Sequence, residues 1–101
     1  MKDKKFPDFT FKNAEGIKYQ TVWKSPAKSF KASGLCDSPN NIDPEIWIDP
    51  TLEEKRLLEV MIEEIIHAHF FEKTEKQVRK LTNNIRRILY KVYNISFKQN
   101  S

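Results

Sequence analysis

Residues 52–71 are the longest segment of the chain in which apolar residues recur at helical spacing. At about 100° per residue, their side chains fall within roughly half of the helix circumference, which is typical of an amphipathic helix packed on a core. This arc consists of Leu57, Leu58, Met61, Ile62, Ile65, Ile66, Ala68 and His69. The sequence therefore predicts one long helix around which the other elements are arranged, with His69 as a core histidine.

Three strand patterns precede this helix. Residues 17–23 alternate apolar and polar side chains in β-prone types, and residues 29–36 alternate more weakly. Residues 44–50 form a third pattern with a proline at each end, which favours an edge strand because proline cannot donate a ladder hydrogen bond. Residues 1–16 are predicted to be an N-terminal arm, of which residues 1–12 are irregular or a short edge strand.

The helix ends also have local signals. Thr51 is predicted to cap the first helix, and Thr74 with Gln77 three residues later forms a capping-box pattern for a second helix. The second helix carries an apolar stripe that we expect to be buried: Val78, Leu81, Ile85, Ile88, Leu89 and Val92. Residues 94–101 are polar and are expected to form a frayed C-terminal tail.

These patterns predict an α+β domain over residues 17–93, with a small, mostly antiparallel three-stranded sheet followed by two helices. The first helix is expected to lay Leu58, Met61, Ile62 and Ile65 against the sheet. A chain of 101 residues has room for one such domain with one core.

Composition excludes several classes of protein. No run of apolar residues approaches the length of a membrane span, and no apolar run follows the N-terminal lysines as in a secretory signal. Cys36 is the single cysteine, so an internal disulfide is excluded and a reducing compartment is favoured. We therefore expect a cytoplasmic protein without membrane contact.

Charge is divided between the two helices. Residues 52–72 contain six acidic and two basic residues, whereas residues 73–93 contain seven basic residues and one acidic residue, Glu75. If the helices pack as a hairpin, the basic side chains of the second helix partly neutralise the acidic side chains of the first. We favour this interpretation over nucleic-acid binding.

Three side chains with site chemistry converge on one face of the first helix. Glu63 precedes His67 by four residues and Glu64 precedes it by three, so the three can approach one point. This spacing suits a metal site. It also suits an exposed acidic face with an ordinary ion pair.

The order of elements resembles a known family. A Gly34-Leu35-Cys36-Asp37 turn, a strand ending in Ile46-Trp47-Ile48-Asp49, and a helix containing Glu64-Ile65-Ile66-His67-Ala68 resemble minimal zincin-type metallopeptidase domains of the SprT-like group, many of them phage-encoded. The resemblance covers residues 17–92. In that family the helix reads His-Glu-Leu-Leu-His-Ala, so Glu63 stands in this chain where the family has its first zinc-binding histidine.

The resemblance implies roles for individual residues. His67 matches the second zinc-binding histidine and Glu64 matches the general base. By ligand chemistry, Glu63 can bind zinc through its carboxylate, and the third ligand is expected from Glu72 or Glu75, of which we favour Glu75. The strand at residues 45–49 is expected to line a cleft for a peptide or protein. A phage-encoded protein of this kind would act in the host cytoplasm.

Two functional classes remain open. The first is a zincin-like metallopeptidase domain whose altered motif leaves its activity weak or lost. The second is a non-catalytic module that binds protein or nucleic acid through an edge strand and the basic second helix. Cys36 is expected to be a turn or core residue rather than a nucleophile paired with His67. Trp47 is expected either to pack under the helices or to rim the cleft.

Overall fold

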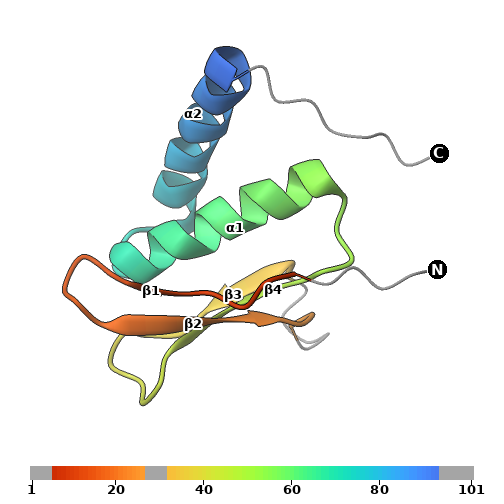
Figure 1. Ribbon diagram of the computed structural model, residues 1–101. Coiled ribbons are helices and arrows are strands. Elements are labelled where there is room, and N and C mark those ends of the chain that lie inside the picture. Colours follow the sequence, from red (N-terminus) through yellow and green to blue (C-terminus); the bar gives the residue numbers. More distant parts are fainter. Residues whose placement is uncertain (1–5, 27–31, 94–101) are drawn as a thin grey trace.

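The fold in the computed structural model, which describes residues 6–26 and 32–93, is a four-stranded mixed sheet followed by two helices, of which the first covers one face of the sheet and the second packs on the first (Figure 1). The strands lie in the order β1-β2-β4-β3. Their bounds are Thr10–Lys12 (β1), Lys18–Trp23 (β2), Gly34–Cys36 (β3) and Glu45–Ile48 (β4). The predicted α+β class is confirmed.

The predicted number of three strands was wrong, because the sheet has four; it is mixed, with two antiparallel pairings and one parallel pairing, in keeping with the mostly antiparallel prediction. Residues 10–12, inside the expected N-terminal arm, form the additional strand β1 and pair antiparallel with β2. β4 pairs parallel with β2 on one side and antiparallel with β3 on the other. Part of the predicted second strand, residues 29–31, lies outside the described residues.

The expected edge position of residues 44–50 was also wrong, because β4 lies between β2 and β3. Its two prolines do not interrupt the ladder. Pro44 and Pro50 flank the strand Glu45–Ile48, and the Pro44 carbonyl accepts a hydrogen bond from the Gln20 amide at 3.1 Å. A proline that flanks the paired residues of a central strand therefore removes no hydrogen bond from the ladder.

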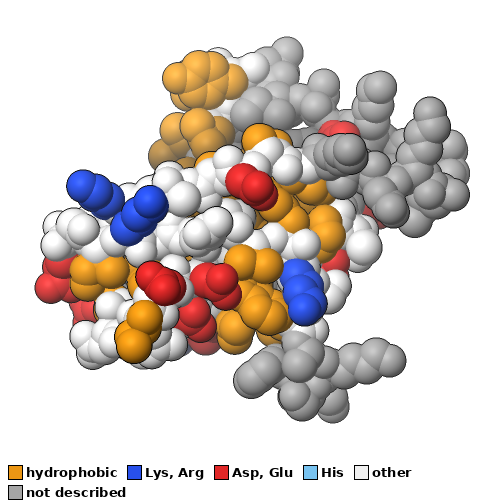
Figure 2. Space-filling model, turned by 60° about the horizontal axis from the view of Figure 1, so that its bottom comes forward, with side chains coloured by type: hydrophobic (Ala, Val, Ile, Leu, Met, Phe, Trp, Pro, Cys, Tyr) orange, Lys and Arg blue, Asp and Glu red, His pale blue; other side chains and the backbone are white. Residues whose placement is uncertain are grey.

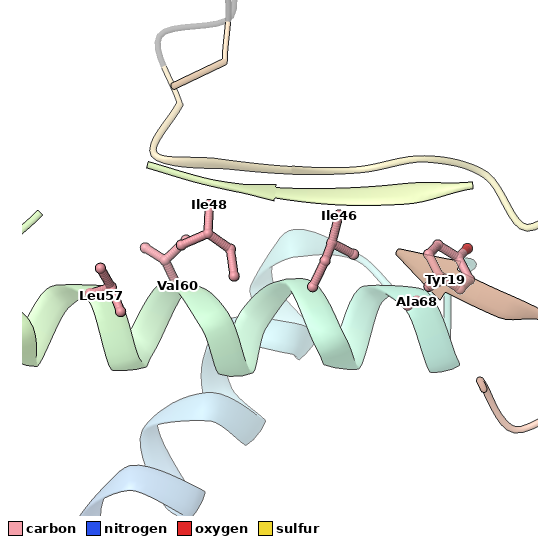
Figure 3. Packing of buried hydrophobic residues seen from close by; sticks show 6 residues of the cluster. All are labelled: Tyr19, Ile46, Ile48, Leu57, Val60 and Ala68. Atoms are coloured by element: carbon pink, nitrogen blue, oxygen red, sulfur yellow. The ribbon is translucent and has the colours of Figure 1, made fainter. Parts of the chain in front are cut away.

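The core lies between the sheet and α1, which spans Glu54–His69. Figure 3 shows Ile46 and Ile48 of β4 pointing toward α1, with Tyr19 of β2 near the end of the helix. The buried cluster comprises Tyr19, Ile46, Ile48, Leu57, Val60 and Ala68. Full burial of an aliphatic side chain of this size contributes roughly 1.5–3 kcal/mol.

The face of α1 that meets the sheet is rotated from the expected one. Met61 and Ile65 pack at the margin of the core, while Leu57, Val60 and Ala68 supply its centre. Ile66, on another part of the apolar arc, lines a hollow together with Val78 of the second helix, α2 (Glu75–Tyr93). The arc is thus divided between two layers, the sheet and α2.

The two helix starts differ in how well local signals predicted them. Thr51 does not cap α1: its hydroxyl donates to Asp49 Oδ1 at 2.7 Å, and the N-cap residue is Glu53 without a side-chain cap. The second capping box is confirmed. The backbone amide of Gln77 donates to the Thr74 hydroxyl at 3.1 Å, and the backbone amide of Thr74 donates to the side-chain Oε1 of Gln77 at 3.0 Å.

α2 spans Glu75–Tyr93 and lies on the side of α1 away from the sheet, crossing it steeply (Figure 1). Its predicted apolar stripe is only partly buried. Val78 is buried, but Leu81, Ile88 and Val92 are 42%, 56% and 66% exposed. The reason is that α2 has α1 as its one extensively contacted neighbour among the described elements. Neither described helix is long and apolar enough to cross a membrane.

The opposite face of the sheet is not covered by either helix. Figure 2 shows hydrophobic side chains on this side separated by acidic and basic ones. Trp47 of β4 lies here, with the Lys24 ammonium 5.4 Å from its ring centre and its indole N–H donating to Glu45. Trp47 therefore neither packs under the helices nor rims the pocket described below.

Candidate functional site

A pocket of about 570 Å³ lies between the edge strand β3 and one side of the two helices. All four residues singled out from the sequence line it: Glu63, Glu64 and His67 from α1, and Glu75 from α2. Other charged or aromatic lining residues are Arg56, Phe71, Lys73 and Arg79. The helical spacing thus correctly predicted that the three α1 residues share one face.

This face is not an exposed acidic surface. Glu63 and Glu64 are each only 8% exposed, because β3 and α2 lie over the helix on this side. Burial of a carboxylate is costly unless it is paired or protonated. The two glutamates meet this requirement in different ways.

Glu63 is paired with a residue that the sequence analysis did not single out. Arg56 Nη1 lies 3.3 Å from Glu63 Oε1 and 3.4 Å from Glu59 Oε1. The other Glu59 oxygen lies 3.1 Å from Nε of Arg86 in α2. Arg56 and Glu63 are seven residues, or two helical turns, apart and therefore lie on the same side of the helix. This spacing could have predicted the pair from the sequence.

Glu64 is packed closely against β3. A Cβ atom built on Gly34 would lie 2.7 Å from Glu64 Oε2. Burial first, and then the neighbouring charges of Glu63 and Glu75, raise the pKa of Glu64 to about 8 against the opposing effect of Arg56. The protonated carboxyl, which can donate an O–H hydrogen bond, is therefore the main form at neutral pH.

His67 and Glu75 connect the two helices. His67 Nε2 lies 3.0 Å from Glu75 Oε1, which the capping box at Thr74 places in the first turn of α2. The Glu75 side chain is 71% exposed, whereas that of His67 is 12% exposed. His69 lies on the other side of α1 and stacks on Phe11 at 5.9 Å, but it is half-buried at the margin of the core rather than inside it.

These donors do not fit a zinc ion in the arrangement observed. Catalytic zinc takes three protein ligands and keeps an open position. Within residues 6–26 and 32–93, no three His, Cys, Asp or Glu side chains are grouped so that they could hold a metal ion. Glu63 instead faces a guanidinium, and His67 already bonds to Glu75.

Cys36 lines the pocket but is held as a thiol. Its Sγ donates to the Asp37 carbonyl at 3.4 Å. Burial first, and then the nearby charge of Glu64, raise the pKa of the Cys36 thiol to about 12. Because the thiolate is the nucleophilic form, Cys36 does not have the environment of a nucleophile.

The strand beside the pocket is β3, not the expected segment at residues 45–49. The Ser33 carbonyl accepts a hydrogen bond from the amide of Asp49, just after β4, and the Asp37 amide donates to the Glu45 carbonyl of β4. Alternation along the strand therefore turns the backbone groups of Gly34 and Cys36 toward the other side. No described strand pairs with that side. An open ladder edge therefore borders the pocket.

Comparison with known proteins adds no identification: no protein-family model, curated protein or solved structure matches this chain.

Proposed function

We propose that this chain is a peptide-binding domain that pairs an extended segment with the open edge of β3. The observation that carries the proposal is the position of the 570 Å³ pocket directly beside that edge. Main-chain hydrogen bonds to an edge strand supply affinity in this mode of recognition, and pockets for alternate side chains supply specificity. The zincin-like resemblance suggests a related layout, but the observed donor arrangement favours binding over metal-dependent hydrolysis.

The backbone geometry defines how a segment would bind. The outward amides and carbonyls of Gly34 and Cys36 provide donors and acceptors for every second residue of the added segment. Side chains of the segment that point toward α1 enter the pocket, and the others point to the opposite face. Recognition thus depends on alternate positions of the peptide.

The charges around the pocket indicate which side chain fits best. Arg79 lines the pocket and has no carboxylate partner within the described part of the chain. Glu64, which lines the same wall, is mainly protonated at neutral pH. We therefore expect an acidic side chain of the peptide to enter the pocket and to pair with Arg79.

The test is selection from a displayed library of short random peptides, followed by affinity measurement for a selected peptide. We expect alternate N-methylation to abolish binding in one register and to spare it in the other, because only every second amide pairs with β3. Arg79→Ala should weaken binding by about tenfold, corresponding to 1.4 kcal/mol. Lys76→Ala is the matched control, since Lys76 is exposed, carries the same charge and does not line the pocket.

Two results would contradict the proposal. One is equal tolerance of N-methylation in both registers, which would show that no ladder forms. The other is equal affinity of the Arg79→Ala and Lys76→Ala variants for the selected peptide, which would place the peptide elsewhere on the surface.

A further inference from the structure

We propose that the exposed apolar strip of α2, formed by Leu81, Ile88 and Val92, binds an amphipathic helix with acidic flanks from a partner protein. This surface is separate from the peptide pocket at β3, and the proposal does not depend on that function. The strip, the hollow at its start and the charge of α2 each support it.

The strip is continuous along the helix. Leu81, Ile88 and Val92 are seven and four residues apart, so they fall on one side of α2 over about three turns, or roughly 16 Å. Their exposures are 42%, 56% and 66%. Three large apolar residues in line, on a helix with a single covered side, form a surface suited to another helix.

The strip begins at a hollow that can receive an anchoring side chain. A depression of about 360 Å³ lies between the end of α1 and the start of α2, lined by Ile66, Phe70, Lys73, Gln77, Val78 and Leu81. Leu81 belongs to both the hollow and the strip. Helix-in-groove recognition uses apolar anchors repeated at such spacings, with one anchor seated in a pocket.

The charge next to the strip specifies the flanks of the partner. Lys80 and Lys91 are exposed on one flank of the strip, and Lys73 borders the hollow. None of the three pairs with an acidic side chain in the described ranges, where Arg86 with Glu59 is the one bridge from a base of α2 to α1. The expected mutual neutralisation of the acidic and basic helices is therefore slight, and the free positive charge favours an acidic partner.

The same observations argue against two other occupants. A second copy would bring the lysine flanks of two α2 helices together, which is unfavourable. Nucleic acid would use the lysines but leave the apolar strip without a role, since phosphate contacts dominate such binding. An acidic amphipathic helix satisfies both features of the surface.

The probe is a synthetic amphipathic peptide with leucines at helical spacing and glutamates beside them, and its control is the same peptide with lysines in place of the glutamates. Using the full chain, we expect the glutamate peptide to bind at least about tenfold more tightly at low salt, and the difference to shrink as salt screens the charges. Ile88→Glu should weaken its binding by about tenfold or more. Lys18→Glu, the same charge change at an exposed residue of β2 away from α2, should alter it by less than about threefold.

Circular dichroism of Ile88→Glu checks that the variant is folded, and we expect no change because Ile88 is 56% exposed. The proposal is overturned if the two peptides bind equally, or if folded Ile88→Glu binds as tightly as the natural chain. It is also overturned if light scattering shows a dimer that Ile88→Glu dissociates, because the strip would then be covered by a second copy.

Discussion

Gly34 in β3 lies so close to Glu64 in α1 that a Cβ atom on residue 34 would be 2.7 Å from Glu64 Oε2 and 2.7 Å from Val60 Cγ1. Real Cβ atoms do not approach other atoms so closely, so the strand and the helix meet at this point without a side chain on the strand. This contact sets the width of the pocket, because it determines how near β3 comes to the face that carries Glu64 and His67.

Gly34→Ala should therefore destabilise the fold by about 1–3 kcal/mol, as overpacking in a well-packed site does. Urea unfolding measures the change. In a Glu64→Ala background the cost should be smaller, because one of the two clashing side chains has been shortened, and this coupling identifies the contact. An equal cost in both backgrounds would contradict the assigned contact.

The raised pKa of Glu64 predicts a specific dependence of stability on pH. The folded state binds the Glu64 proton up to about pH 8, whereas the unfolded chain releases it near pH 4.5, the usual pKa of a glutamate side chain. Between these values the folded state binds more protons, so the contribution of Glu64 to stability is full below pH 4.5 and is lost as pH rises to 8. The slope is at most about 1.4 kcal/mol per pH unit.

Glu64→Gln provides the control, because the amide keeps the shape of the side chain without titrating. Both proteins are unfolded with denaturant at intervals of about one pH unit between pH 5 and pH 9. The free energy of unfolding of the natural protein should fall relative to that of the variant as pH rises. Parallel curves for the two proteins would mean that Glu64 is ionised in the fold.

Arg56 should be needed to keep Glu63 buried. The Glu63 side chain is 11% exposed, and Arg56 Nη1 is 3.3 Å from its carboxylate. Arg56→Ala leaves this charge with no partner and should cost about 1–3 kcal/mol in thermal or urea unfolding. Glu63→Gln in the same background should recover much of the loss, since a neutral amide needs no counter-charge. Without such recovery, the effect of Arg56 would come from packing alone.

Glu63→His should increase the zinc affinity of the chain. The substitution places two imidazoles one helical turn apart at residues 63 and 67, with Glu75 nearby as a carboxylate donor, and it removes the carboxylate that Arg56 engages. Titration calorimetry of metal-free protein should show zinc affinity at least about tenfold above that of the natural chain. Adding His67→Ala should abolish the gain. If the natural chain already binds zinc tightly, the conclusion that its donors do not fit the metal is wrong.

The sequence alone determined the features that depend on local spacing. The common face of Glu63, Glu64 and His67 follows from the helical repeat, and the capping box at Thr74 follows from two residues within one turn. The alternation over residues 17–23 correctly predicted a half-buried strand, which is β2 and has Tyr19 and Thr21 on its buried face. In each case the interacting groups are within a few residues of one another, so backbone geometry relates them directly.

Tertiary structure decided which neighbour covers each face. Helical spacing could not show that β3 and α2 would bury Glu63 and Glu64, or that β4 would enter the sheet between β2 and β3. It also could not show that Ile88 and Val92 would stay exposed. An apolar stripe indicates which side of a helix is suited to burial, but not whether another element covers that side. The neighbours of these residues come from distant parts of the chain, and their positions depend on the packing of the whole domain.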